Sequence, residues 1–247
     1  MHRIDVRRAA DRFTTTGDRL TSRHSFSFGR HYEPDNVRHG SLVAHNDDIV
    51  APGAGYDAHP HRDMEIVTWV VRGSLVHEDS TGTRGVIHPG LVQRLSAGSG
   101  VIHSERNDEA APGEPARPVR FVQMWVPPDE PGLQPRYAQF DVAAALATGE
   151  LVPVASGMAR DRSTAGVGIA NRSAALHAAR LGPGRSVVLP DAAYLHLFVA
   201  HGTAHLEGAG ALAEGDAVRL TGSGGQRVTG TADAAEILVW EMHPPAG

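Results

Sequence analysis

Short apolar runs separated by turn residues recur along the chain. Phe121–Val126 is an apolar run between the proline-rich segments Ala111–Pro118 and Pro127–Pro135, which predicts a buried strand between two loops. The 28 glycines and 16 prolines supply the turns that many short strands require. One alanine-rich segment, Val142–Ala147, instead predicts a short packing helix with Asp141 as its N-cap. The pattern as a whole predicts an all-β protein.

Two pairs of polar residues have the i, i+2 spacing that places side chains on one face of a strand. They are His59 with His61, and His103 with Glu105. Three imidazoles and a carboxylate suit iron, zinc, nickel, copper or manganese, and they leave open positions on a six-coordinate ion. Geometry leaves a second carboxylate open as a ligand, because Glu65 would share a face with the first pair on a regular strand. The sequence therefore predicts one metal site with either carboxylate.

A segment of the chain is repeated at long range. Residues 85–100 align without gaps on residues 210–225, which predicts a duplicated barrel. Carried forward, the register sets Val228 and Gly230 of the second copy opposite His103 and Glu105. We therefore expect the second copy to bind no metal.

The repeat also suggests a division of the chain into two domains. A boundary near Gln134, at the end of the second proline-rich segment, gives a metal-binding domain over residues 1–134. The remaining residues, 135–247, would form the degenerate copy, whose role would be stability and shielding. The expected stoichiometry is one metal ion per chain.

Composition excludes several classes of function. The 247 residues contain no cysteine, which rules out disulfides, thiolate ligands and cysteine nucleophiles. All 23 basic residues are arginines, they are scattered, and the net charge is −5, so we expect no direct binding of nucleic acid. No stretch approaches the roughly 18 consecutive apolar residues of a membrane span, and Met1–Leu20 has no apolar run like that of a signal peptide. The expected location is the cytoplasm, away from membranes.

Motifs around the predicted ligands resemble a known family. Gly53, five residues before His59, and Gly100, three residues before His103, resemble the two-part motif of the cupin barrels. The resemblance narrows to the short bacterial members of the pirin family and covers roughly residues 20 to 140. The segments that carry it are His24–Gly29, Asn46–Asp48, His59–Glu65, His77–Gly82 and Ser96–Glu105.

The resemblance to pirins implies a fold and a ligand set. It implies a bicupin, two tandem β-barrels of the jelly-roll type, with one mononuclear metal in the N-terminal barrel, usually iron. In pirins the carboxylate ligand lies two residues after the last histidine, which here is Glu105. We then expect the Glu65 carboxylate to orient a metal-bound imidazole by accepting a hydrogen bond from it, as carboxylates commonly do.

Family resemblance also implies an activity. Some pirins cleave the flavonol quercetin with dioxygen, opening a ring and releasing carbon monoxide, whereas eukaryotic members act as transcriptional co-regulators. For this chain we expect the enzyme, with Glu105 as the catalytic base. The alternative is an iron-binding redox sensor that acts on a protein partner, which the sequence does not name. Residues expected to wall the substrate pocket are Phe26, Phe28, Met124 and Trp125.

The remaining candidates have simpler interpretations. His77 could support a ligand histidine, but a turn contact beside Asp79 and Ser80 is the favoured interpretation. Ser104 lacks the G-x-S-x-G elbow of a hydrolase nucleophile. Pro60, between two ligands, places its segment at the start or edge of a sheet. Four further histidines are expected to be structural or exposed: His88, His196, His201 and His205.

Overall fold

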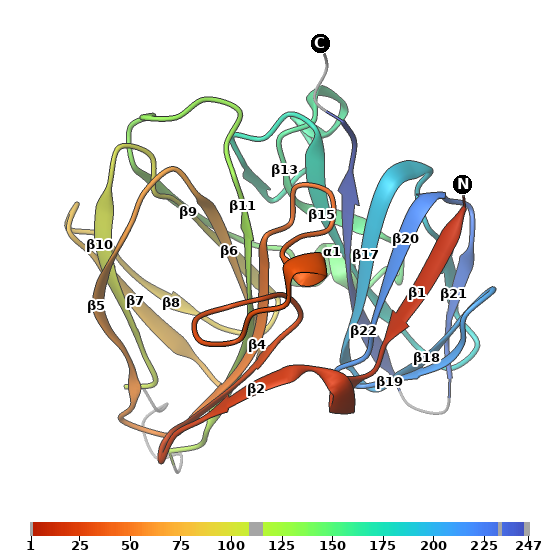
Figure 1. Ribbon diagram of the computed structural model, residues 1–247, viewed down its shortest axis with the longest axis horizontal. Helices are drawn as coiled ribbons and strands as arrows, with labels where there is room; N and C mark the ends of the chain where they lie inside the picture. The colour runs from red at the N-terminus through yellow and green to blue at the C-terminus, as the bar shows by residue number, and fades with distance from the viewer. Residues whose placement is uncertain (1, 109–115, 232–233, 245–247) are drawn as a thin grey trace.

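The computed structural model describes residues 2–108, 116–231 and 234–244. Within these ranges the strands form four sheets, two of seven strands and two of four, with one α-helix of a single turn. Each seven-stranded sheet is combined with a four-stranded sheet in one barrel, and the two barrels lie side by side (Figure 1). The predicted all-β, two-barrel architecture is confirmed.

The first barrel is built mainly from the N-terminal half of the chain. In spatial order its large sheet contains β12 (Arg136–Asp141), β9 (Leu91–Ser96), β6 (Glu65–Arg72), β11 (Val119–Val126), β4 (Ala44–Val50), β3 (Leu20–His24) and β2 (Phe13–Thr16). Its small sheet contains β5 (Gly55–His61), β10 (Val101–Arg106), β7 (Leu75–Asp79) and β8 (Arg84–Ile87). The predicted buried strand is β11, which lies between β6 and β4.

The second barrel repeats this plan. Its large sheet contains β1 (Arg3–Arg7), β20 (Ala217–Ser223), β17 (Ala192–His201), β22 (Ala235–Met242), β15 (Ala174–Leu181), β13 (Val152–Ser156) and β14 (Val167–Gly168). Its small sheet contains β16 (Ser186–Val188), β21 (Arg227–Gly230), β18 (Thr203–Leu206) and β19 (Gly210–Ala213). The small sheets have the same strand order, and the aligned repeat corresponds to β8–β9 in one barrel and β19–β20 in the other, so the duplication is confirmed.

The N-terminal strand belongs to the barrel that is formed by the C-terminal half. β1 pairs antiparallel with β20, from Arg3 opposite Thr221 to Arg7 opposite Ala217, and Figure 1 shows it on the far side from β5 and β10. β12 takes the corresponding place beside β9 in the first barrel. The division at residue 134 remains a prediction about folding units, since strands on both sides of it complete the other half's sheets.

Three apolar regions stabilise this arrangement. Between the large sheets, Val67, Trp69 and Met124 of the first barrel pack with Phe198 and Trp240 of the second. The interior of the second barrel is filled by aliphatic side chains. The interior of the first barrel has two smaller apolar clusters, and its interior also contains buried polar residues. These polar residues are the candidates for chemistry.

Local predictions about the helix and loops have mixed outcomes. The helix α1 spans Ala143–Leu146, and the Asp141 carboxylate accepts the N–H of Ala143 at 2.8 Å, although the residue that precedes the helix is Val142. Leu146 is buried between the barrels, which confirms the packing role. Residues 109–115 of the first proline-rich segment lie outside the described residues. No helix in the described part of the chain is long and apolar enough to span a membrane.

Candidate metal centre

Adjacent strands of the small sheet bring three histidines together. β5 and β10 pair antiparallel with His59 directly opposite His103, and His61 lies two residues along the same face. The ring centroids are 4.5 Å apart for His59 and His103, and 4.8 Å apart for His61 and each of the other two. β5 is the edge strand and Pro60 is exposed, so the predicted edge position is confirmed.

Hydrogen bonds determine which nitrogen of two of these rings carries a lone pair. His59 Nδ1 lies 2.7 Å from the carbonyl oxygen of Asp57, which can only accept, so Nε2 is free of a proton in the neutral ring. His77 Nε2 lies 3.2 Å from Asp79 Oδ2, so the neutral His77 ring accepts at Nδ1. The donor is His103 Nδ1 at 3.4 Å, which leaves His103 Nε2 as a lone pair.

Two of the Nε2 atoms in the cluster are buried. The Nε2 atoms of His61 and His103 are inaccessible to solvent and have no hydrogen-bond partner among the described residues. A buried nitrogen without a partner is costly, and a bound metal ion would satisfy it. The donor atoms of His59, His61 and His103 lie within 4.8 Å of one another, so the residues present are suited to hold a metal ion.

Burial also keeps the rings in the form that binds metals. Desolvation, together with the neighbouring His59 and His61, lowers the pKa of His103 to about 3. Desolvation lowers the pKa of His61 to about 4, with a contribution from His59. Both rings are therefore neutral near pH 7, as metal coordination requires.

The predicted carboxylate lies beside this cluster, on the next residue of the same face of β10. A bulge shifts the register of β10 against β5 between His103 and Glu105, and Gly55 lies so close that a Cβ there would be 2.2 Å from the Glu105 carbonyl oxygen. Glu105 is buried, and its oxygen lies within 4.8 Å of donor atoms of His77 and His103. The structure thus shows two donor sets that share His103.

The environment of Glu105 favours its protonated form. The pKa of Glu105 is raised to about 7, because burial and the nearby Asp48 raise it by more than the hydrogen bonds from Gln123 lower it. A carboxyl group with a pKa near 7 can exchange a proton at neutral pH. Gln123 was not predicted as a site residue, and the only signal for it in the sequence is a polar residue within the apolar run of β11.

The second candidate carboxylate lies elsewhere. Glu65, at the start of β6 in the large sheet, accepts a hydrogen bond from Ser96 Oγ at 2.8 Å. It belongs to neither donor set, and no hydrogen bond joins it to His59, His61 or His103 among the described residues. Glu65 therefore does not have the supporting position that the resemblance suggested, because its strand is in the sheet opposite β5. His77, by contrast, contacts both His103 and the turn residue Asp79.

Of the four predicted wall residues, two lie at the site and two do not. The Trp125 ring packs edge-on against His61 at 4.9 Å between centroids, and Phe28 packs against Trp125 at 5.4 Å. Met124 points to the opposite face of β11, where its sulfur accepts the indole N–H of Trp240. Phe26 is also buried between the barrels, with the Arg219 guanidinium 4.3 Å from its ring centre. The prediction that Met124 and Phe26 line the metal pocket is therefore wrong.

The remaining histidines lie outside both donor sets. His88, His201 and His205 are exposed, and His196 is buried against His45 between the barrels. They are structural or exposed, as expected. Ser104 alternates to the face opposite His103 and Glu105.

The equivalent position of the second barrel is apolar. Val228 on β21 lies opposite Val187 on β16, as His103 lies opposite His59, and the next same-face position is the buried Leu189. Val187, Leu189 and Val228 belong to the aliphatic core of that barrel. Gly230 follows Val228 at the place of Glu105.

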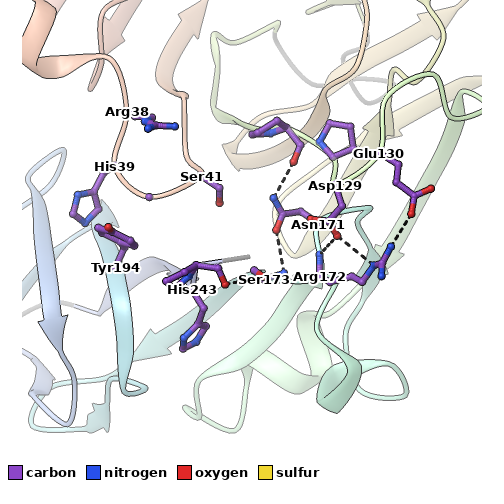
Figure 2. Close-up of a pocket in the computed structure, with 14 residues that line it drawn as sticks. Arg38, His39, Ser41, Asp129, Glu130, Asn171, Arg172, Ser173, Tyr194 and His243 are labelled. Atoms are coloured by element: carbon purple, nitrogen blue, oxygen red, sulfur yellow. Dashed lines mark hydrogen bonds and ion pairs between the residues drawn. The ribbon is translucent and has the colours of Figure 1, made fainter. Parts of the chain in front are cut away.

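A separate groove lies between the barrels. It has a volume of about 930 Å³, and the four predicted ligands are not among its lining residues. Figure 2 shows its walls, with Arg38, His39 and Tyr194 on one side and Asp129 and Arg172 on the other. Arg172 pairs with Glu130 at 2.7 Å, so the loop after β11 is held to the segment before β15. The groove therefore belongs to the contact between barrels, not to the metal centre.

Comparison with known proteins identifies the family. A family model described as pirin matches residues 5–126. A protein of Mycobacterium tuberculosis named "Putative quercetin 2,3-dioxygenase" is 53% identical over 244 residues, which cover 99% of this chain and 97% of the relative. The chain belongs to the pirin family. The Escherichia coli K12 pirin relative named "Quercetin 2,3-dioxygenase" is 39% identical over 136 residues, 55% of this chain and 57% of its own length.

A solved pirin structure shares the whole fold. The crystal structure of bacterial pirin YhhW from Escherichia coli in complex with nickel(II) superposes with a TM-score of 0.85 and 27% identity, covering 99% of this chain and all of the other. The two-barrel pirin architecture therefore extends over both halves of the chain. The two donor sets described above are consistent with a metal site in this chain.

Proposed function

We propose that this pirin is a metal-dependent dioxygenase that opens the ring of quercetin-like flavonols. The observation that carries the proposal is the convergence of His59, His61 and His103 beside a buried glutamate, next to the aromatic side chains of Trp125 and Phe28. The names of the relatives support the choice of substrate. Iron is the proposed metal, with nickel and manganese as alternatives that the same donor atoms accept.

The roles of the side chains follow from their positions. His59, His61 and His103 would hold the ion, and Glu105 would complete its ligands. When bound, such an ion lowers the pKa of a flavonol hydroxyl and brings the flavonol and dioxygen together. Glu105 accepts the proton of the 3-hydroxyl group, for which its buried carboxylate beside His103 is placed. Trp125 and Phe28 exclude water from the side of His61.

The overall reaction balances without another reactant. Both atoms of dioxygen enter the products, two carbon–carbon bonds of the central ring break, and the carbon between them leaves as carbon monoxide. The remaining rings are joined as an ester. The enol proton that Glu105 accepts returns to the carboxylic acid product.

The direct test combines metal analysis with oxygen uptake. Protein loaded with one equivalent of iron should consume dioxygen when quercetin is added, bleach the visible absorption of the flavonol and release carbon monoxide, whereas metal-free protein should not. Absence of flavonol-dependent uptake with iron, nickel and manganese would reject the dioxygenase. The iron-binding redox sensor with a protein partner would then be the better hypothesis.

Glu105→Gln tests the proposed base. The amide keeps the size and an oxygen atom but cannot accept the proton, so turnover should fall by about 100- to 10,000-fold. Glu65→Gln is a matched control, since Glu65 is an equally buried glutamate of the same barrel outside the donor sets. Metal content must be measured for both variants. Equal activity of Glu105→Gln and Glu65→Gln at equal metal content would show that Glu105 is not the base.

A further inference from the structure

The carboxylate of Glu105 is held from the opposite sheet. Gln123 Nε2, on β11, lies 2.8 Å from both Oε1 and Oε2 of Glu105. Both side chains are buried. No ion pair joins Glu105 to an arginine or a histidine among the residues that the structure describes. The amide of Gln123 is therefore the group that satisfies this carboxylate across the interior of the barrel.

Trp125 determines how the Gln123 amide is oriented. The indole Nε1 can only donate, and it lies 3.1 Å from Gln123 Oε1. This contact fixes the oxygen of the amide toward Trp125 and the NH2 group toward Glu105. Since Trp125 also packs against His61, one connected set of side chains runs from the histidine cluster to the carboxylate.

We propose that Gln123 is the positioning residue for Glu105, and that it holds the carboxylate beside His77 and His103 with Trp125 fixing the amide. The metal-binding part of this proposal depends only on the donor sets, whereas its catalytic part rests on the proposed flavonol dioxygenase. Among the described residues, no hydrogen bond joins Gln123 to His59, His61 or His103. Its effect should therefore pass entirely through Glu105.

The experiment compares two buried glutamines of one sheet. Gln123→Met keeps the length and volume of the side chain but removes the N–H donor. Gln93→Met is the matched control, because Gln93 and Gln123 lie opposite Thr68 from either side, on β9 and β11, and Gln93 is equally buried but not bonded to Glu105. Nickel(II) affinity of the metal-free proteins is measured by calorimetry, with thermal unfolding as the check on folding.

The expected result is selective. Gln123→Met should weaken nickel(II) binding by about 10- to 100-fold, the range for hydrogen-bond partners of metal ligands, and Gln93→Met should leave it within about twofold. In a Glu105→Ala background, Gln123→Met should cause no further loss. Trp125→Phe, which keeps the ring against His61 but releases Gln123 Oε1, should give a smaller loss in the same direction. It also serves as the test if Gln123→Met does not fold.

Two outcomes would overturn the proposal. One is unchanged nickel(II) affinity in Gln123→Met, and the other is an equal loss with and without Glu105. If the wild type turns over quercetin, Gln123→Met should also lower kcat with little change in KM. If the wild type is inactive, the proposed dioxygenase fails, but the calorimetry still decides the role of Gln123.

Discussion

The two barrels place opposite kinds of side chain at the same position of the small sheet. In the first barrel, β5 and β10 present His59, His61, His103 and Glu105 to the interior. In the second, the equivalent positions on β16, just after it and on β21 are Val187, Leu189, Val228 and Gly230. The strand order and the facing pairs are the same in both. The fold thus does not need the polar residues, because the second barrel forms a small sheet of the same strand order with apolar residues in their places.

The difference shows how the site lowers the stability of the first barrel. Burial of aliphatic side chains stabilises the folded state. Burial of unpartnered Nε2 atoms, such as those of His61 and His103, destabilises it because these atoms lose their hydrogen bonds to water. Residues that weaken a core and are nevertheless present at one point of a barrel are typical of functional sites. The second barrel therefore serves as an internal reference for the first.

Converting the first barrel toward the second should have the largest effect. His103→Val gives β10 the residue that β21 has, and removes the histidine shared by both donor sets. We expect nickel(II) affinity to fall by more than the roughly 100-fold limit for outer hydrogen-bond partners. The thermal unfolding temperature of the metal-free variant should change little, because the unpartnered Nε2 is lost from the core while His77 Nδ1 loses the proton that it accepts. Binding of one equivalent of nickel(II) with unchanged affinity would contradict the assignment of His103 as a metal ligand.

The reverse change should damage stability without creating a site. Val228→His buries a ring with no partner in the aliphatic core of the second barrel. The expected cost is about 1–3 kcal/mol in the free energy of unfolding, measured by chemical denaturation of metal-free protein. Metal titration should still saturate at one equivalent per chain. A second tight site, or no loss of stability, would show that the equivalence of β10 and β21 is wrong.

A smaller effect on nickel(II) affinity should come from His77, the hydrogen-bond partner of His103. His77 accepts the Nδ1 proton of His103 and donates to Asp79, whereas the second barrel has Ala204 at the corresponding place on β18. His77→Phe removes the acceptor while keeping a ring against Tyr137. Nickel(II) affinity should fall by about 10- to 100-fold. Ser80→Ala, a change in the adjoining turn, is the control, and an equal loss in both would reduce His77 to a turn contact.

The sequence was sufficient to predict the parts of the site that depend on spacing along one strand. The i, i+2 pairs identified the cluster of His59, His61 and His103, and the repeat predicted the apolar character of the second copy. Strand alternation also explains why Trp125 and Met124 could not both line one pocket. One of any two consecutive residues on β11 must face the other barrel.

Other parts depend on which strands meet across the barrel. The contact of Gln123 with Glu105 joins the large and small sheets, and the position of Glu65 follows from the assignment of β6 to the large sheet. Neither is encoded in local spacing, because sheets pair by long-range contacts. The same holds for β1, whose partner lies in the other half of the chain.

That first strand has a consequence for how the protein is made. β1 is synthesised well before its partner β20, and the ion pair between Arg8 and Asp216 links residues 208 positions apart. β1 can therefore pair only after the roughly 200 residues that separate it from β20 have been synthesised. β22, the last strand described, lies in the same sheet as β1, so the second barrel contains the first and the last of the described strands. The large sheet of the barrel without the metal ligands therefore forms later in synthesis than that of the first barrel, whose strands lie within residues 13–141.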